Sequence, residues 1–346
     1  MRLRRYVAIL TVCLLSLLSG HRFAAQAATY TPLPAHVYAP YYETYLSSTP
    51  SITATAQSSG ARYFTLAFLQ AAAKGSCTAT WNGSNSQPVT GGTYVSDIAS
   101  LRAMGGDVIP SFGGYSADKN GTEVAEACTD VNNLAAEYES VITSLGTTRL
   151  DMDIEGAALN DTASIDRRNK ALTMVEQWAA QQGIPLQIQY TLPVEPYGLD
   201  PNGLSVLQNA AQNGTAVTSV NIMVFDYYQK NEGTVNMGNA AVQAAQNVYS
   251  QLASVYPNAT AAQLWNMEAF TMLPGIDDYP KKTEVTYLSD AQTMLNFANA
   301  NNMNFLSIWA IQRDNGGCPG VTDSNTCSGI TQNTWDFSHL LEPFTH

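Results

Sequence analysis

The chain has 346 residues, of which 45% are hydrophobic and 13% are charged. It carries 16 lysines and arginines against 28 aspartates and glutamates, which gives a formal net charge of −12 at neutral pH. This charge repels nucleic acids and anionic membrane surfaces, so neither is an expected partner. A neutral substrate polymer is compatible with it.

Residues 1–28 are predicted to be a secretion signal. Several arginines precede a short apolar core at 7–18, and 25-AQA-27 is a small-x-small cleavage site. The core is shorter than the roughly 20 residues that span a bilayer, and no later segment reaches that length. Loss of the signal removes four arginines and leaves a formal charge of −16. The mature protein, 29–346, is expected to be a secreted, extracellular monomer.

Eight β-rich apolar segments recur along the rest of the chain, with helix-like stretches between them. Several are almost continuously hydrophobic, which is typical of parallel strands covered on both faces. The predicted strands are 36–43, 63–70, 107–114, 148–155, 186–194, 218–228, 261–270 and 304–312.

Amphipathic repeats predict helices in the intervals. In 164–183, apolar residues recur at three- and four-residue steps, and Gly183 is suited to end the helix. Segments 129–145, 236–254 and 289–301 have the same character. No linker or low-complexity run divides the chain, so one domain is expected. Alternating strands and helices predict an α/β fold, a single (β/α)8 TIM barrel.

The carboxyl ends of the strands meet at one mouth of such a barrel, where active sites lie. Polar and aromatic residues at these ends are therefore expected to be functional. The candidates at these ends are Ser111, Gly113, Gly114, Glu155, Asp226, Tyr227, Tyr228, Trp309 and Gln312.

Four cysteines remain after the signal segment: Cys77, Cys128, Cys318 and Cys327. An even number in an oxidising compartment indicates two disulfides, although four cysteines allow three pairings. Because Cys318 and Cys327 bracket a short loop, the favoured pairs are 318–327 and 77–128. No CxxC occurs and the mature histidines form no ligand pattern, so no metal site is expected.

The stretch 149-RLDMDIEG-156 alternates acids with apolar residues. In a strand, this period of two places Asp151, Asp153 and Glu155 on one face, about 6.6 Å apart. Like-charge repulsion inside a barrel mouth raises carboxyl pKa values. We therefore expect Glu155 to stay protonated as a general acid, while Asp151 and Asp153 share a proton or exchange partners.

A row of this kind indicates glycosidase chemistry, in which an acid protonates the leaving oxygen. Most glycosidases need a second carboxylate about 5 Å or more away across the bond. Asp153 lies on the same strand and the same side as Glu155, so it is poorly placed as a nucleophile. The acetamido oxygen of an N-acetyl sugar could take that role instead, with Asp153 orienting it. This route predicts an N-acetylglucosamine substrate and no cofactor.

With these residues the chain resembles family 18 of the glycoside hydrolases, the chitinases, over most of its mature length. The stretch 151-DMDIE-155 matches the end of the family's strand-4 motif DGxDxDxE. The stretches 111-SFGG-114 and 223-MVFD-226 are similar to the SxGG and MxYD motifs of strands 3 and 6. Two further segments, 189-QYTLPV-194 and 326-TCSGITQ-332, look like the secreted bacterial branch.

The resemblance implies a role for each residue of the row. Glu155 would be the acid/base, Asp153 would orient the 2-acetamido group, and Asp151 would be its buried partner. Ser111 to Gly114 would be structural, because small residues permit close backbone approach at a strand end. The implied substrate is chitin or N-acetylglucosamine oligomers, cleaved with retention through an oxazolinium intermediate. The implied cleft is lined by Tyr41, Met223, Asp226 and Trp309, with Trp309 as the floor of the −1 sugar subsite.

Two positions depart from the family's motifs. The first aspartate of DGxDxDxE falls at Thr148, so any proton relay is one carboxylate shorter. The tyrosine of MxYD, whose hydroxyl helps to hold the acetamido group, falls at Phe225. Tyr190, Tyr227 or Tyr228 could supply that hydroxyl.

Three other functions stay open. An endo-β-N-acetylglucosaminidase acting on glycans would use the same site. A non-catalytic chitin-binding lectin is less expected, because such lectins usually lack the glutamate found here at Glu155. A two-carboxylate glycosidase would pair Glu155 with Glu268, but it leaves Asp151 and Asp153 unexplained.

The interval between the last two predicted strands, 271–303, is too short for the large α+β insertion that deepens the cleft of some family members. We therefore expect an open, shallow groove and endo cleavage.

Overall fold

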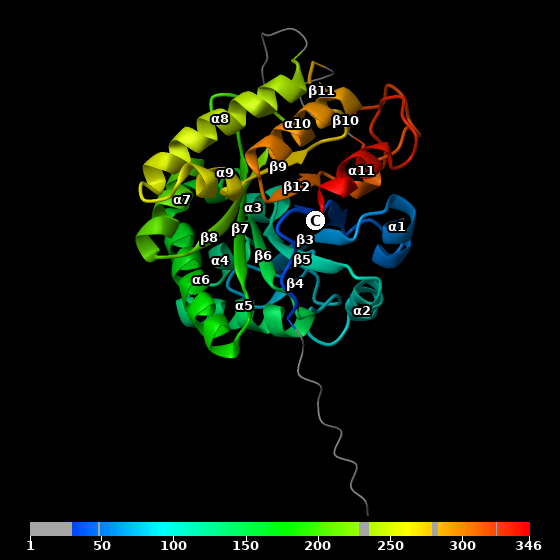
Figure 1. Ribbon diagram of the computed structural model, residues 1–346. Coiled ribbons are helices and arrows are strands. Elements are labelled where there is room, and N and C mark those ends of the chain that lie inside the picture. The colour runs from blue at the N-terminus through cyan, green and yellow to red at the C-terminus, as the bar shows by residue number, and fades with distance from the viewer. Residues whose placement is uncertain (1–29, 48, 228–234, 279–282, 323) are drawn as a thin grey trace, which may run out of the picture.

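The computed structural model describes residues 30–47, 49–227, 235–278, 283–322 and 324–346 (Figure 1). The expected signal segment, 1–28, lies outside these residues, as does Tyr228. Within them, no helix has the length and apolar character needed to cross a bilayer.

Parallel strands close into a barrel at the centre of the molecule (Figure 1). The first barrel strand is split: β1 (Val37–Tyr38) pairs with the last strand and β2 (Tyr41–Glu43) pairs with the second. All neighbouring barrel strands are parallel, which confirms the predicted (β/α)8 fold. The other barrel strands are β3 (Tyr63–Ala71), β5 (Asp107–Gly113), β6 (Arg149–Asp153), β7 (Gln187–Pro193), β8 (Val217–Met223), β9 (Glu268–Met272) and β12 (Phe305–Ile308).

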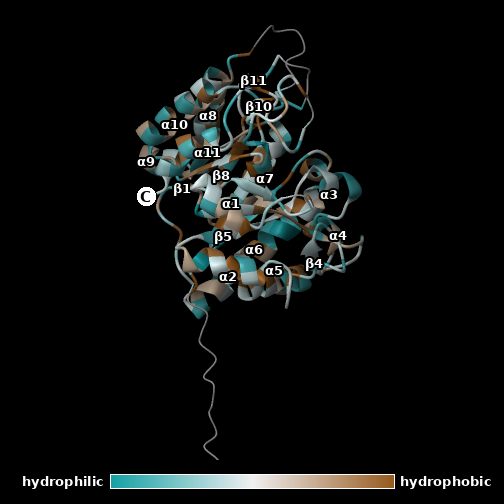
Figure 2. Ribbon diagram, turned by 90° about the vertical axis from the view of Figure 1, so that its right-hand side faces the viewer, coloured by the Kyte–Doolittle hydropathy of each residue, from teal (hydrophilic) through white to brown (hydrophobic). Residues whose placement is uncertain are grey.

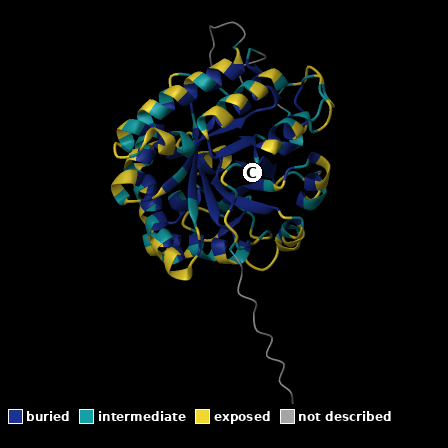
Figure 3. Ribbon diagram, viewed as in Figure 1, coloured by how far each residue is buried: buried dark blue, intermediate teal, exposed yellow. Residues whose placement is uncertain are grey.

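Helices surround the strands, and their outer faces are exposed while the strands are buried (Figure 3). The longer ones are α1 (Ile52–Ser59), α2 (Val95–Ala103), α5 (Val131–Leu145), α6 (Thr162–Gln182), α7 (Pro201–Asn213), α8 (Met237–Val255) and α10 (Leu288–Asn301). The shorter ones are α3 (Tyr115–Asn120), α4 (Val124–Ala127), α9 (Ala261–Met267) and α11 (Asp336–Leu341), with 3-10 turns η1 (Ala158–Asn160), η2 (Ile311–Arg313) and η3 (Glu342–Phe344).

The four predicted helices correspond to α5, α6, α8 and α10, within two residues at each end. In α6, the Asp161 side chain accepts hydrogen bonds from the first-turn amides of Ala163 and Ser164. Gly183 ends the helix in the left-handed region, as predicted, at φ 70°. Hydrophilic and hydrophobic residues alternate along these helices (Figure 2), so each covers the barrel with one face.

The predicted strand 261–270 is wrong over most of its length. Residues 261–267 form α9, and the strand β9 begins only at Glu268. Thr260 and Gln263 form a capping box in which each side chain bonds the other's backbone amide. This local signal starts a helix and overrides the apolar content of the segment. Two other strands are shorter than predicted, since β8 ends at Met223 and β12 ends at Ile308.

Both expected disulfides are present. Cys77 pairs with Cys128 and ties the loop after β3 to the end of α4, and Cys318 pairs with Cys327. A short strand, β4 (Ala79–Trp81), pairs antiparallel with the last residues of β3. Between β9 and α10, the described residues form only the hairpin of β10 (Gly275–Ile276) and β11 (Val285–Thr286).

Candidate active site

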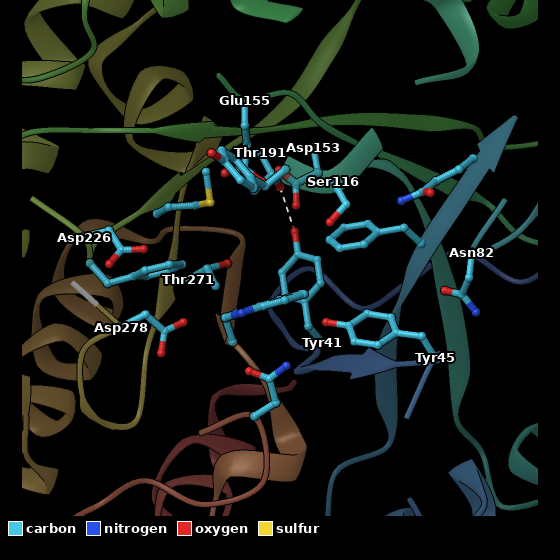
Figure 4. Close-up of a pocket in the computed structure, with 17 residues that line it drawn as sticks. Tyr41, Tyr45, Asn82, Ser116, Asp153, Glu155, Thr191, Asp226, Thr271 and Asp278 are labelled. Atoms are coloured by element: carbon cyan, nitrogen blue, oxygen red, sulfur yellow. Dashed lines mark hydrogen bonds between the residues drawn. The ribbon is translucent and has the colours of Figure 1, made fainter. Parts of the chain in front are cut away.

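A groove crosses the carboxyl ends of the strands. It consists of a cavity of about 520 Å³ and an adjoining one of about 290 Å³. Residues common to both cavities include Glu155, so this carboxyl lies where the two halves meet. Figure 4 shows Tyr41, Asp153 and Thr191 converging beside Glu155, with Asp226 and Asp278 at the opposite wall. The shared residues are Tyr115, Glu155, Met223, Phe225 and Asp226.

Asp151 is fully buried at the base of the row and is held by four side-chain donors. Its Oδ2 accepts hydrogen bonds from the Tyr41 hydroxyl at 2.8 Å and the Ser111 hydroxyl at 2.7 Å. Its Oδ1 accepts from the Thr191 hydroxyl at 2.7 Å and from Gln189 Nε2 at 3.0 Å. Burial raises the pKa of Asp151, while these hydrogen bonds oppose that rise. Ser111, expected only to permit backbone approach, is therefore also a donor to the acid row.

Asp153 lies above Asp151, with only 3% of its surface exposed. Burial raises its pKa well above the ordinary value, and repulsion by Glu155, Asp151 and Asp118 adds to the rise. Its Oδ1 has no hydrogen-bond partner among the described residues. Burial and repulsion therefore both favour the neutral form of Asp153, next to the groove.

Glu155 follows β6 and reaches the groove partly exposed. Partial burial beside the groove is the main reason why the pKa of Glu155 is raised, to about 7. Burial, and not the predicted repulsion within the row, is the largest cause of this rise. Either way, the Glu155 carboxyl holds a proton near neutral pH and can donate it to a bound molecule.

Asp118 on α3 is a fourth carboxyl in this region, which no sequence motif indicated. Its Oδ2 accepts a hydrogen bond from the backbone amide of Glu155 at 2.5 Å. Burial, followed by the nearby Glu123 carboxylate, raises the pKa of Asp118 to about 9. A neutral Asp118 therefore holds the backbone of Glu155 in place without adding a negative charge at pH 7.

Aromatic side chains form the wall beside the acids. Trp309 stacks on Phe68 with ring centroids 5.4 Å apart and an interplanar angle of 25°. It also meets the edge of Tyr41 at 5.3 Å. Trp309 is partly exposed and lines the larger cavity, so one indole face is free to stack on a sugar ring. Phe68 was not predicted, because nothing in the β3 sequence distinguishes it from a core residue.

Gly113, the last residue of β5, and Gly114, which follows it, have no room for a side chain. A Cβ at Gly113 would lie 2.1 Å from the carbonyl oxygen of Asp153, and one at Gly114 would lie 2.5 Å from the Phe68 ring. Both glycines have positive φ. The expected close backbone approach at this strand end is confirmed. The absence of side chains at the two glycines lets Phe68 and the end of β6 pack directly against their backbone.

Tyr190 was predicted in the groove, and that prediction is wrong. It pairs with Met152 on β6 and faces the helix layer, where its buried hydroxyl donates to Asn169 of α6 at 2.5 Å. Strand alternation instead turns Gln189 and Thr191 into the barrel. The sequence 187-QIQYTLP-193 indicates this orientation, because Gln187, Gln189 and Thr191 alternate with Ile188, Tyr190 and Leu192.

Tyr227 and Gln312 also lie outside the groove, contrary to prediction. Tyr227 is buried, and its backbone amide donates to Glu284 at 2.9 Å. Gln312 lies in η2, where its Nε2 donates to the backbone oxygen of Glu43 at 3.3 Å. In both cases the strand ends earlier than predicted, β8 at Met223 and β12 at Ile308. The residues that follow therefore do not continue the strand toward the barrel mouth. With Tyr190 also turned away, neither described tyrosine replaces the hydroxyl absent at Phe225.

Glu268 does not face Glu155 across the groove. It begins β9, whereas Glu155 follows the end of β6, and parallel strands place these positions at different levels of the barrel. Glu268 is buried and lines neither half of the groove. Glu268 therefore cannot act with Glu155 as the second carboxylate of a two-carboxylate glycosidase.

The opposite wall contains more carboxyls. Asp226 lines both halves of the groove, and its backbone amide donates to Asp277 at 2.9 Å. Asp278 lines the larger half and is paired with Arg313 at 3.0 Å. Within the described part of the chain, no three histidine, cysteine or carboxylate side chains converge as a metal site.

Comparison with known proteins supports the reading of this groove. Residues 37–283 match the sequence model of the glycosyl hydrolases family 18. The chain is 35% identical over 322 residues to a probable bifunctional chitinase/lysozyme of Escherichia coli (strain K12), covering 90% of this chain and 35% of that protein. It is 34% identical over 287 residues to Endochitinase 11 of Metarhizium anisopliae, covering 81% and 53%. The chain thus spans about a third to a half of these relatives.

Solved structures agree. The catalytic domain of a hyperthermophilic chitinase from Pyrococcus furiosus is 30% identical, with a TM-score of 0.77 over 90% of this chain and 96% of that one. Human YKL-39, described as a pseudo-chitinase with retained chitooligosaccharide binding properties, shares the fold at 9% identity, with a TM-score of 0.60 over 90% and 99% of the two chains. The matched family range contains the whole acid row of β6. The chain belongs to family 18 of the glycosyl hydrolases.

Proposed function

We propose that the protein is an endo-acting chitinase that hydrolyses β-1,4-linked N-acetylglucosamine polymers with substrate assistance. The observation that carries this proposal is the position of Asp153. Its carboxyl lies beside the groove, between the anchored Asp151 and the acid Glu155. A carboxyl in that place is suited to hold the acetamido group of a sugar stacked on Trp309.

The proposed reaction has two steps. Glu155 donates its proton to the glycosidic oxygen while the acetamido oxygen attacks the anomeric carbon, so one C–O bond breaks as another forms. Asp153 accepts a hydrogen bond from the acetamido nitrogen and stabilises the oxazolinium that results. Glu155, now a carboxylate, then removes a proton from water, which opens the oxazolinium and regenerates the β-anomer.

The charge of the groove favours a neutral polymer over an anionic one. Six carboxyls line its two halves, while the described lining residues include no lysine, arginine or histidine. A sugar with its own carboxylate, such as the N-acetylmuramic acid of peptidoglycan, would meet repulsion on both sides of the cleavage point. The carboxyls are Asp153, Glu155, Glu195, Asp200, Asp226 and Asp278.

The proposal is tested with a set of substrates. N-acetylglucosamine oligomers should be cleaved, with the β-anomer appearing first by NMR. Cello-oligosaccharides of equal length, which lack the acetamido group, should be inert, and peptidoglycan should be cleaved at least about tenfold more slowly. Cleavage of cello-oligosaccharides, or the α-anomer as first product, contradicts substrate assistance. Release of intact glycans from a glycoprotein, without cleavage of the oligomers, would assign the endo-β-N-acetylglucosaminidase function instead.

The pH dependence of the reaction follows from Glu155. The general acid is active while protonated, and burial raises the pKa of Glu155 to about 7. Because the pKa is raised, the acid form is fully present at pH 5 and is lost as pH rises through 7. We expect kcat/KM to fall about tenfold per pH unit above that point. Initial rates at low substrate concentration measure this limb, and a fall that begins near pH 4.5 would contradict the burial of the carboxyl.

We further propose that the protein is exported. The two disulfides support this, since such bonds persist in oxidising compartments.

A further inference from the structure

A buried arginine lies beneath the acid row. Strand alternation places Arg149 on the same inner face of β6 as Asp151, one step closer to the closed end of the barrel. Only 1% of Arg149 is exposed, and its guanidinium lies 5.7 Å from the Phe305 ring centroid. Arg149 occupies the glycine position of the DGxDxDxE motif, so this cation is a feature of this chain and not of the motif.

Arg149 has no direct carboxylate partner within the described residues. Its Nε donates to Gln187 Oε1 at 2.9 Å and its Nη1 donates to Gln189 Oε1 at 3.3 Å. Burial lowers the pKa of Arg149 to about 10, so it remains a cation at neutral pH. A cation in this low-dielectric interior needs a negative charge nearby.

Gln189 connects that cation to Asp151. A guanidinium can only donate hydrogen bonds, so Gln189 must turn its oxygen toward Arg149 and its NH₂ group toward Asp151. Gln189 Nε2 donates to Asp151 Oδ1 at 3.0 Å. The amide is therefore oriented, and it passes the polarisation of the cation to the carboxylate.

The four donors around Asp151 fill the acceptor sites of a carboxylate, which has about four. Adding a proton to Asp151 would displace at least one of these bonds. It would also leave Arg149 without its nearest negative charge. Asp151 is thus built to remain ionised, although burial alone would favour its neutral form.

We propose that Arg149 and Gln189 are positioning residues that keep Asp151 ionised, so that the mobile proton of the row is confined to Asp153 and Glu155. The catalytic part of this proposal rests on the proposed function. It differs from the expectation that Asp151 and Asp153 share a proton. The titratable or charged groups around the row are Tyr41 of β2, Asp118 of α3, Arg149, Asp153 and Glu155 of β6 and its end, and Asp226 after β8.

The test compares pH profiles of kcat/KM on N-acetylglucosamine oligomers. Arg149→Met removes the cation, and Gln189→Leu cuts its connection to Asp151. Each should move the acidic limb to higher pH by about one unit or more, because Asp151 then takes up a proton more readily. Arg149→Lys keeps the charge and should return the limb toward that of the wild type. Gln187→Leu is the matched control, since it removes a contact of Arg149 but not the connection, and its limb should stay in place.

A merely structural role has a different signature. In that case Arg149→Met and Gln189→Leu lower kcat by a constant factor at every pH, and the proposal is overturned. If Arg149→Met does not fold, as judged by circular dichroism, Gln189→Leu decides the matter alone.

Carboxyl ¹³C NMR of the unliganded protein separates this proposal from the proposed function. The Asp151 signal, assigned by its loss in Asp151→Asn, should not titrate between about pH 5 and about pH 8 in the wild type and should titrate in Gln189→Leu. This holds even if the wild type cleaves no N-acetylglucosamine oligomer, a result that would remove the function and not the role of Arg149. An Asp151 carboxyl that titrates in the wild-type protein overturns the proposal.

Discussion

Replacement of Glu155 by glutamine is expected to lower kcat on N-acetylglucosamine oligomers by about 10²–10⁴-fold. Glutamine has nearly the same shape but no proton to donate, so the leaving oxygen departs unprotonated. The groove and the Trp309 wall stay intact, so the affinity for an oligomer should change by less than about threefold. Reducing-end assays measure kcat, and calorimetry measures the affinity of the inactive variant.

The matched control is Glu139→Gln, which makes the same chemical change on α5, away from both halves of the groove. It should retain wild-type rates. Activity of Glu155→Gln within tenfold of the wild type would show that another group is the acid. A variant that lost binding along with turnover would instead point to a distorted groove.

Replacement of Asp153 by alanine is expected to lower kcat by about 10²–10³-fold, the usual loss when one transition-state partner is removed. The acetamido group would lose the carboxyl that orients it, and the oxazolinium would lose the hydrogen-bond acceptor beside its nitrogen. Binding of a thiazoline analogue of that intermediate should weaken by a similar factor, whereas binding of an unreacted oligomer should change little. Inhibition constants and kcat measured side by side test this match.

Asp166→Ala provides the control for this change. Asp166 is a partly exposed acid on α6 that pairs with Lys170 and lines neither half of the groove, so its removal should leave both values unchanged. Equal losses of oligomer and thiazoline affinity in Asp153→Ala would contradict a role specific to the intermediate. Such a result would favour uniform substrate binding as the function of Asp153.

Strand alternation accounts for both a correct and a wrong site prediction. Applied to β6, it placed Asp151 and Asp153 together, and both face the interior. In β7, the same rule gives Tyr190 the parity of the apolar positions, which face the helices, so the prediction that its hydroxyl reaches the groove is wrong. Gln189 and Thr191 were therefore missed.

The prediction for Glu268 failed for a different reason. The residue is separated from the groove because a capping box at Thr260 starts a helix where a strand was expected. A shift of a strand start by seven residues moves a side chain from the mouth of a barrel toward its closed end. Element boundaries depend on a few capping contacts, whereas the type of a long periodic segment depends on many residues.

The sequence by itself determined the fold class, the four predicted helices, the acid row and the disulfide pairs, because periodicity and spacing can be read along the chain. Only the tertiary structure decided what surrounds that row. The donors to Asp151 come from β2, β5 and β7, and Tyr41 lies 110 positions away from it in the chain. Burial of Glu155 likewise depends on the whole barrel mouth. Closure of the barrel brings these distant groups together, and their desolvation and hydrogen bonds then determine which carboxyl holds the proton.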